Sequence, residues 1–223
     1  MRILRVLAFA LALTGIAPAA QATTATQVVE GATRAVADFL DALPPEDVTR
    51  IYVQNAYAVL VMPDVIKGGF VLGAEHGFGV LLVRDPESGG FGPPAFFEAF
   101  GGSLGLQAGG KSSDVLVTLM NERAVEAMLD GDIRMGGELS LAVLRVGGSF
   151  GAGTTTAFGE DLYLFERTRG FFGGASLSGA SIRPQQVHNE DYWGGRTNAD
   201  AVVRDFDRVD PRSAELRDLL TEF

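Results

Sequence analysis

The sequence contains no cysteine, only two lysines and only two histidines. The absence of cysteine excludes disulfides, thiolate metal sites and a lipid-modified cysteine near the N-terminus. Acidic residues outnumber basic residues by 28 to 18, which gives a formal net charge of −10. Nucleic-acid binding needs clustered positive charge, and an anionic membrane would repel this chain overall. We therefore expect no nucleic-acid partner, and any anion site must be a local cluster of cations.

Long hydrophobic runs are also missing, except near the N-terminus. Arg2 and Arg5 precede an apolar stretch at 6–16, and Ala20–Ala22 supplies a small-x-small cleavage pattern. This order is typical of a signal peptide, and the stretch is too short for a permanent bilayer-spanning helix. We expect a signal peptide at 1–22, cleavage after Ala22, and a periplasmic or secreted protein. Retention of the segment as an anchor is the alternative.

Helical periodicity appears at both ends of the remaining chain and once inside it. Residues 26–43 carry apolar side chains at helical spacing, within a helical N-terminal segment at 23–56. An internal helix is predicted over "NERAVEAML", where Asn121 supplies the cap. The chain ends in a helical tail at 196–223, whose last helix begins at Pro211 and packs on the same domain.

A glycine-rich β pattern fills 57–195, the expected β-rich domain. Four Gly-Gly pairs each precede a strand-like stretch, at 68–69, 101–102, 136–137 and 173–174. Glycine inside strands marks bends and bulges, so its repetition predicts strong sheet curvature; simple turns are the alternative. We predict an α+β fold with a single glycine-rich, mainly antiparallel curved sheet, barrel-like or a sandwich. N-terminal, internal and C-terminal helices flank this sheet.

The string "GLQAGGKS" at 105–112 matches the phosphate-binding pattern G-x-x-x-x-G-K-[ST]. In that pattern Lys111 would reach the phosphates, Ser112 would hold magnesium, and a helix would begin at the lysine. Here "SDVLVTLM" follows, which is typical of a strand. We interpret the string as a turn between two antiparallel strands, with Lys111 solvated at its tip. A strand after Lys111 and no bound nucleotide are expected.

Other candidate chemistry is sparse. "HNEDYW" places His188, Glu190 and Asp191 close together, but no second spaced cluster completes a metal site, so we predict a solvated loop there. The G-x-S-x-G pattern of a nucleophilic serine is absent. We expect no catalytic residue, no metal and no cofactor, which favours a binding module over an enzyme.

Two segments combine features that suit an amphiphilic ligand. In "FERTRGFFGG", Arg167 and Arg169 share one side of a predicted strand, and Phe171 and Phe172 follow directly. Cations beside aromatic side chains suit a lipid headgroup and its interface, although a strand with an outward charged face is the simpler interpretation. The Gly/Pro loop "GGFGPPAFF" presents Phe91, which could insert into an interface or pack on the core.

Several long segments together resemble the SYLF domain family, over about Tyr57 to Gly195. They read "MPDVIKGGFVLGAEHGFGVLLVR", "PPAFFEAFGGSLGLQAGGKSSDVLVTLMNERAVEAML", "RTRGFFGGASLSGASIRP" and "NEDYWGG". The resemblance implies a lipid-binding module and not an enzyme; eukaryotic members bind phosphoinositides and regulate actin. The basic N-terminal segment of those members is lacking, since Arg34 is the lone cation among Glu30, Asp38 and Asp41. With its predicted signal peptide, the chain resembles the secreted bacterial type of this family.

We therefore expect a non-enzymatic lipid-binding module of the phosphatidylinositol or phospholipid type, whose partner is a lipid or membrane surface at the cell envelope. The candidate headgroup contacts are Lys67, Lys111, Arg167, Arg169 and Arg183. The candidate apolar contacts are Phe91, Phe171, Phe172 and Trp193. An envelope structural or protein-interaction factor is the alternative, and a nucleotide enzyme using 105–112 is a third.

Overall fold

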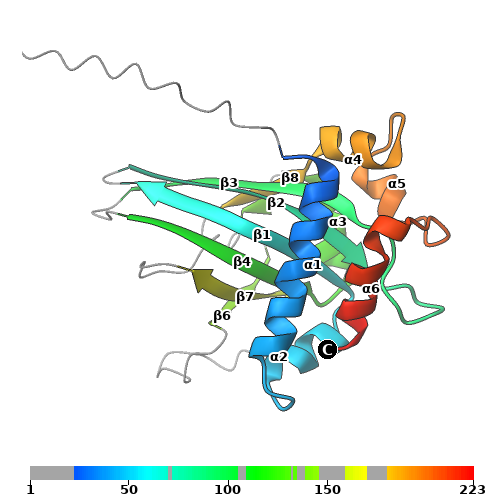
Figure 1. The fold of residues 1–223 in the computed structure, drawn as a ribbon, viewed down its shortest axis with the longest axis horizontal. Coiled ribbons are helices and arrows are strands. Elements are labelled where there is room, and N and C mark those ends of the chain that lie inside the picture. Colours follow the sequence, from blue (N-terminus) through cyan, green and yellow to red (C-terminus); the bar gives the residue numbers. More distant parts are fainter. Residues whose placement is uncertain are drawn as a thin grey trace, which may run out of the picture.

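The computed structural model describes residues 23–69, 72–104, 109–131, 133–134, 139–145, 159–169 and 180–223. Within them, eight strands form one sheet in the order β5-β8-β3-β2-β1-β4-β7-β6 (Figure 1). All neighbouring strands are antiparallel except β6 and β7. The sheet curls, which confirms the predicted α+β class and its mainly antiparallel curved sheet. The strands are β1 (Ala58–Gly69), β2 (Leu72–Val83), β3 (Ala95–Leu104), β4 (Gly109–Leu119), β5 (Ile133–Arg134), β6 (Leu141–Arg145), β7 (Leu162–Arg169) and β8 (Ser181–Pro184).

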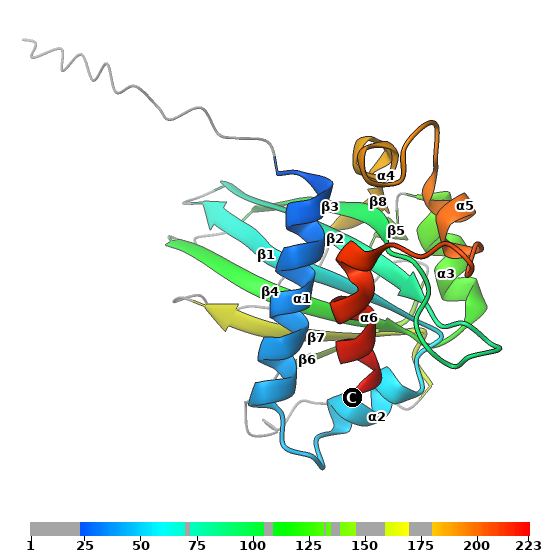
Figure 2. The ribbon, with the colours of Figure 1, turned by 45° about the vertical axis from the view of Figure 1, so that its right-hand side comes forward.

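Helices cover both faces of this sheet. We call the face that carries α1 and α6 the outer face, and the face that carries α3 and α5 the inner face. Figures 1 and 2 show α1 and α6 side by side across the outer face. The helices are α1 (Ala25–Ala42), α2 (Val48–Gln54), α3 (Glu122–Asp130), α4 (Gln186–Trp193), α5 (Ala199–Val203) and α6 (Ala214–Thr221), the last preceded by a 3₁₀ turn (Pro211–Ser213).

The helix predicted over 26–43 is α1, and local signals define both of its ends. Thr24 and Gln27 form a reciprocal capping box at the N-terminus, which satisfies two otherwise unpaired backbone N–H groups. Pro44 stands directly after the last turn at Leu43. Because its apolar side chains recur at helical spacing, α1 buries one stripe, including Phe39, against the outer face.

The two faces of the central strands enter two separate cores. In β1, Leu60 and Met62 point to the inner face, whereas Val59 and Val61 point to the outer face. Strand side chains alternate, so a continuous apolar run is needed wherever both faces are covered. Each fully buried aliphatic side chain contributes about 1.5–3 kcal/mol. The helix-covered half of the sheet is therefore the hydrophobic centre of the domain.

The segment "HNEDYW" is helical, which corrects the predicted solvated loop. It lies in α4, whose first turn is capped by the Gln185 side chain accepting from the His188 backbone N–H. Asn189 fixes the helix to β3, since its side chain exchanges hydrogen bonds with the backbone N–H and C=O of Phe96. Tertiary hydrogen bonds thus order a segment whose apolar periodicity is weak.

Candidate functional site

The phosphate-loop match ends in a strand, as predicted. Lys111 and Ser112 lie inside β4, and the next helix, α3, begins at Glu122. Ser112 pairs with Ile66 of β1 on one side and with Arg169 of β7 on the other. A phosphate loop needs a helix N-terminus at the lysine, and a strand occupies that position. Residues 105–108 lie outside the described residues.

The two lysines of the chain are neighbours in the sheet and both are buried. Lys67 of β1 pairs in register with Lys111 of β4 on the inner face. Lys111 Nζ lies 2.7 Å from Glu166 Oε1, and Lys67 Nζ lies 3.3 Å from Glu75 Oε2. The burial of Lys111 corrects the expectation of a solvated lysine at a turn. Both ammonium groups proposed as headgroup contacts are paired with glutamates in this structure.

Hydroxyl groups complete the surroundings of Glu166. Ser113 Oγ and Thr168 Oγ1 both donate to Glu166 Oε1, at 2.7 and 2.8 Å. Position 111 shares the inner face with Ser113 and Val115, because these residues are spaced by two along β4. That alternation explains why Lys111 turns inward. Buried charges need such partners, since an unpaired one loses its hydration without compensation.

The three predicted arginines lie at different places on the sheet. Arg167 of β7 binds Asp38 of α1 at 2.5 Å, and its Nη1 lies 3.6 Å from Asp114, so it ties α1 to the outer face. Arg169 is the last residue of β7, and its side chain lies outside the described residues. Arg183 of β8 donates to Glu98 at 2.6 Å and stacks over the Phe100 ring at 4.8 Å. Arg167 and Arg183 are not brought together, because β4, β1, β2 and β3 lie between their strands.

The predicted apolar contacts are not gathered on one surface either. Phe91 is 1% exposed, so of the two alternatives left open by the sequence it packs on the core and does not present its ring to an interface. An isolated bridge to Arg84 folds the loop back, and the Arg84 guanidinium covers the ring at 4.3 Å. Trp193 is partly buried and donates its indole N–H to Pro94. Phe171 and Phe172 lie outside the described residues.

The sheet extends beyond α1 into a surface with few side chains. The Gly-Gly pairs 68–69 and 101–102 lie inside β1 and β3, so simple turns are the wrong interpretation there; 136–137 and 173–174 lie outside the described residues. Two rows on the outer face of this end run across four adjacent strands, about 14 Å wide at the usual strand spacing. The rows are Gly110-Gly68-Ala74-Gly102 and Ser112-Ile66-His76-Phe100.

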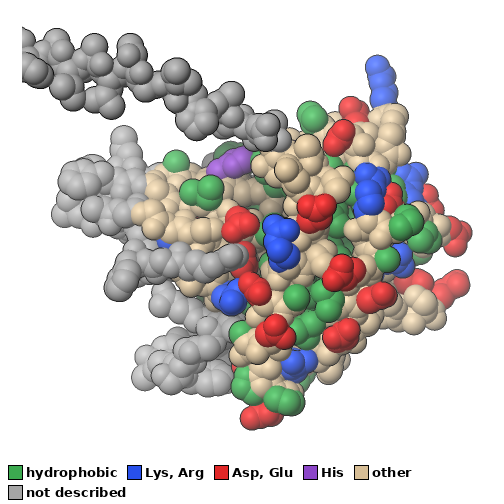
Figure 3. Space-filling view, in the orientation of Figure 1, with side chains coloured by type: hydrophobic (Ala, Val, Ile, Leu, Met, Phe, Trp, Pro, Cys, Tyr) green, Lys and Arg blue, Asp and Glu red, His purple; other side chains and the backbone are tan. Residues whose placement is uncertain are grey.

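This glycine end of the outer face exposes apolar side chains. Ile66 is 63% exposed and Phe100 is 38% exposed, and His76 lies between them. Figure 3 shows a histidine and apolar side chains at this end, with acidic and basic side chains mixed over α1. Because Ala74 is the only non-glycine residue of the row Gly110-Gly68-Ala74-Gly102, the backbone itself forms the neighbouring surface.

A groove of about 500 Å³ lies beside this surface, between the N-terminal half of α1 and the sheet. Glu30, Gly31 and Arg34 line its helix side, and Pro63 and Asp64 line its sheet side. A β-bulge interrupts β1 here, with the Asp64 backbone at φ 49°. A Cβ on residue 31 would lie 3.0 Å from Pro63 Cγ, so glycine allows this close approach of helix and strand.

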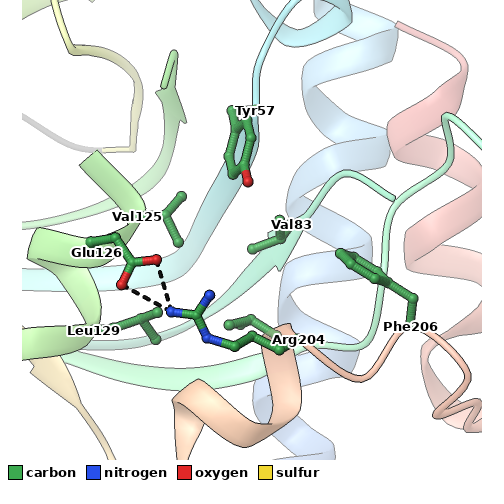
Figure 4. A pocket seen from close by; sticks show the side chains of 8 residues that line it. Tyr57, Val83, Val125, Glu126, Leu129, Arg204 and Phe206 are labelled. Carbon is green, nitrogen blue, oxygen red and sulfur yellow. Dashed lines mark hydrogen bonds and ion pairs between the residues drawn. The ribbon is translucent and has the colours of Figure 1, made fainter. Parts of the chain in front are cut away.

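A second pocket of about 270 Å³ opens between α3, α5 and the ends of β1 and β2 (Figure 4). Val83, Leu129 and Phe206 supply apolar walls, and Arg204 binds both carboxylate oxygens of Glu126 at 2.8 and 2.9 Å. This ion pair balances the charge in the pocket, so the pocket can accept an apolar group.

Two of the groups with shifted pKa values, Asp161 and Tyr192, serve structural contacts. Hydrogen bonds from Arg123, Asn121 and Ser140 hold the pKa of Asp161 well below its usual range. Burial, with the nearby Asp210 carboxylate, raises the pKa of Tyr192 to about 12. Neither group lines the groove or the pocket of Figure 4.

The described ranges contain neither a metal-ligand cluster nor a membrane-spanning helix. No three histidine, aspartate or glutamate side chains gather there in a way that could hold a metal ion. Among the same residues, no helix has both the length and the apolar character needed to cross a bilayer.

These observations define an α+β domain with one curled sheet, a pair of buried lysine–glutamate contacts and an accessible glycine-rich sheet end. The chain belongs to the Ysc84 (SYLF) family, whose model, described as "Las17-binding protein actin regulator", matches residues 100–223. This confirms the resemblance drawn from the sequence motifs. The match includes α5 and α6, which lie beyond the segment 57–195.

Curated relatives support the same membership. The chain is similar to SH3 domain-containing YSC84-like protein 1 of Xenopus laevis, at 30% identity over 60% of this chain and 40% of that protein. The human protein of that name is 28% identical over 67% of this chain and 44% of its own length. Protein YSC84 of Saccharomyces cerevisiae is 24% identical over 76% of this chain and 36% of its own length. The chain thus spans less than half the length of these relatives.

Sequence reasoning missed the groove and its residues. It treated Arg34 only as the lone cation of an acidic helix, because nothing local shows which side of α1 faces a bulged strand. Gly31 was the available signal, since glycine inside a helix costs about 1 kcal/mol and is kept where a neighbour comes close. Its partner, Pro63, lies on another element.

Proposed function

We propose that this chain is a non-enzymatic module that binds phospholipid and acts at the cell envelope after loss of 1–22. The observation that carries the proposal is the glycine end of the outer face. There Ile66 and Phe100 stand exposed on either side of His76, next to a row made of backbone and small side chains. Exposed apolar side chains on a smooth surface suit the boundary between headgroups and acyl chains.

Arg183 adds the cation that this surface needs. Its guanidinium stacks on Phe100, and its side chain is about half-exposed although Glu98 binds it. A cation beside an aromatic ring can bind a lipid phosphate while the ring enters the interface. The net charge of −10 opposes purely electrostatic attraction to anionic membranes, so apolar contact carries most of the binding.

Vesicle flotation at low salt tests the proposal, with phosphatidylcholine, phosphatidylglycerol and phosphatidylinositol vesicles. The double variant Ile66→Ser/Phe100→Ser should bind at least tenfold less, because two inserted side chains contribute roughly 1 kcal/mol each. Ile51→Ser is the matched control, since Ile51 is 56% exposed on α2, away from this surface. Failure of the unmodified protein to bind any vesicle would refute lipid binding.

A protein-interaction factor is the second candidate. The pocket of Figure 4 favours it, because Tyr57 and Phe206 border an apolar space large enough for a side chain of a partner. The family description names a binding partner and actin regulation, which suit this candidate for relatives of the chain. Partners that co-purify with the protein and are lost in Phe206→Ser, without lipid dependence, would favour it.

A further inference from the structure

Arg34 is an unusual cation in this acidic protein. Of the cations whose side chains the structure describes, only Arg34 and Arg196 have neither an ion pair nor a hydrogen bond. Arg196 lies in the exposed segment after α4, whereas Arg34 lines the groove beside Ile66. The groove therefore contains positive charge that the described residues leave unneutralised.

Glu30 lines the same groove and also lacks a partner. It precedes Arg34 by four residues, a spacing and order that favour an ion pair on a helix surface. The described contacts nevertheless include no such pair between them. The side chains of Glu30 and Arg34 are both exposed to solvent. Asp64 lines the opposite wall of the groove.

We propose that the groove binds the headgroup of a zwitterionic phospholipid, a step that rests on the lipid binding proposed above. Arg34 binds the phosphate, and Glu30 binds the ammonium group. The aromatic rings of His76 and Phe78, packed edge to face at 4.8 Å, form the wall against the ammonium methyl or methylene groups.

Charge complementarity selects this headgroup over an anionic one. Arg34 and Glu30 carry opposite charges and together add no net positive charge to the groove, so a headgroup carrying only phosphate would leave the Glu30 carboxylate without a partner. A headgroup with both signs satisfies Arg34 and Glu30 together. Ile66 lines the groove and is also exposed on the glycine end, so the glycerol and first acyl carbons would continue onto that surface.

Flotation with phosphatidylcholine vesicles, with and without 30% phosphatidylglycerol, tests the proposal on the purified protein. Arg34→Gln should weaken binding to phosphatidylcholine about tenfold, the worth of one charge-assisted contact, while Arg196→Gln should leave it unchanged. Glu30→Gln should weaken binding to phosphatidylcholine but strengthen binding to the anionic mixture. The control for Glu30→Gln is Glu46→Gln, because Glu46 is an exposed acidic residue outside the groove.

The outcomes separate this inference from the proposed function. If vesicle binding requires phosphatidylglycerol, and Arg34→Gln and Arg196→Gln bind vesicles equally well, the proposed zwitterionic headgroup site is refuted. Lipid binding itself would remain supported. Loss of all vesicle binding by the unmodified protein would overturn both. Soluble glycerophosphocholine should compete with vesicles at millimolar concentration and inorganic phosphate should not; equal competition would mean a simple anion site and would overturn the proposal.

Discussion

Replacement of Lys111 by methionine should destabilise the fold strongly, because this lysine has a structural role in the sheet. The side chain of Lys111 is fully buried and its ammonium lies 2.7 Å from Glu166 Oε1. Removing one partner of a buried ion pair leaves the other charge uncompensated, at a cost of about 3–5 kcal/mol. Ser113 and Thr168 still donate to Glu166, so we expect the lower end, about 3 kcal/mol. At about 2–4 °C per kcal/mol, the melting temperature should fall by roughly 6–12 °C.

A double-mutant cycle measured by urea unfolding separates this contact from a general loss of packing. Glu166→Met alone should also destabilise, and Lys111→Met/Glu166→Met should lose less than the sum of the singles, with a coupling of about 2 kcal/mol. Arg204→Met is the control, because its pair with Glu126 is half-exposed and contributes about 0–1 kcal/mol. A Lys111→Met variant within 1 kcal/mol of the unmodified protein would refute the reasoning.

Three further changes test the fold. Gly79→Ala should lose about 1–3 kcal/mol in urea unfolding, because its Cβ would lie 2.5 Å from the Val61 carbonyl oxygen; unchanged stability would contradict this close approach. Asp161→Asn should lose roughly 1–3 kcal/mol at pH 7, since the carboxylate accepts a charge-assisted hydrogen bond from Arg123. Because folding lowers the pKa of Asp161, its contribution is fully present above about pH 4 and is lost progressively as pH falls from there towards the lowered pKa of the folded state, so the stabilities of the two proteins should approach each other below pH 4. Thr24→Ala should cost about 1 kcal/mol by removing the α1 cap, measurable by thermal unfolding, and no change would mean that the cap is dispensable.

The elements that the sequence predicts correctly have local causes. The Asn121 cap and the good helix formers after it are sufficient to indicate α3, and the β-branched run after Lys111 is sufficient to indicate β4. The glycine-rich texture likewise indicates a curved sheet. For α3 and β4, the signal and the structure lie within a dozen residues of each other.

The missed features have distant causes. Lys111 is buried because Glu166 meets it from a strand 55 residues away, a pairing that no local pattern specifies. Phe91 is buried because a bridge to Arg84 turns its loop back. Helix α4 is anchored through Asn189 to a strand 93 residues earlier. Sheet register and tertiary hydrogen bonds determine all three, and neither can be derived from composition or periodicity.

The two ends of the sheet differ in a way that argues for function at the glycine end. The helix-covered end buries apolar side chains on both faces, which is the cheapest way to stabilise a sheet. The glycine end instead places two lysine–glutamate pairs on its inner face and backbone on its outer face. Apolar residues of similar volume would often be as stable as buried ion pairs, so stability alone does not explain these charges.

The proposed lipid binding would explain the outer face of this end, whereas folding stability alone does not. Glycine in strand interiors costs stability, yet three of the four positions in the outer row beside Ile66 and Phe100 are glycine. Substituting serine for Gly68 and Gly102 should preserve or improve stability while weakening vesicle binding, because the new side chains would hold a lipid away from the backbone. Substitutions that lower stability and leave binding intact would instead assign these glycines to sheet curvature.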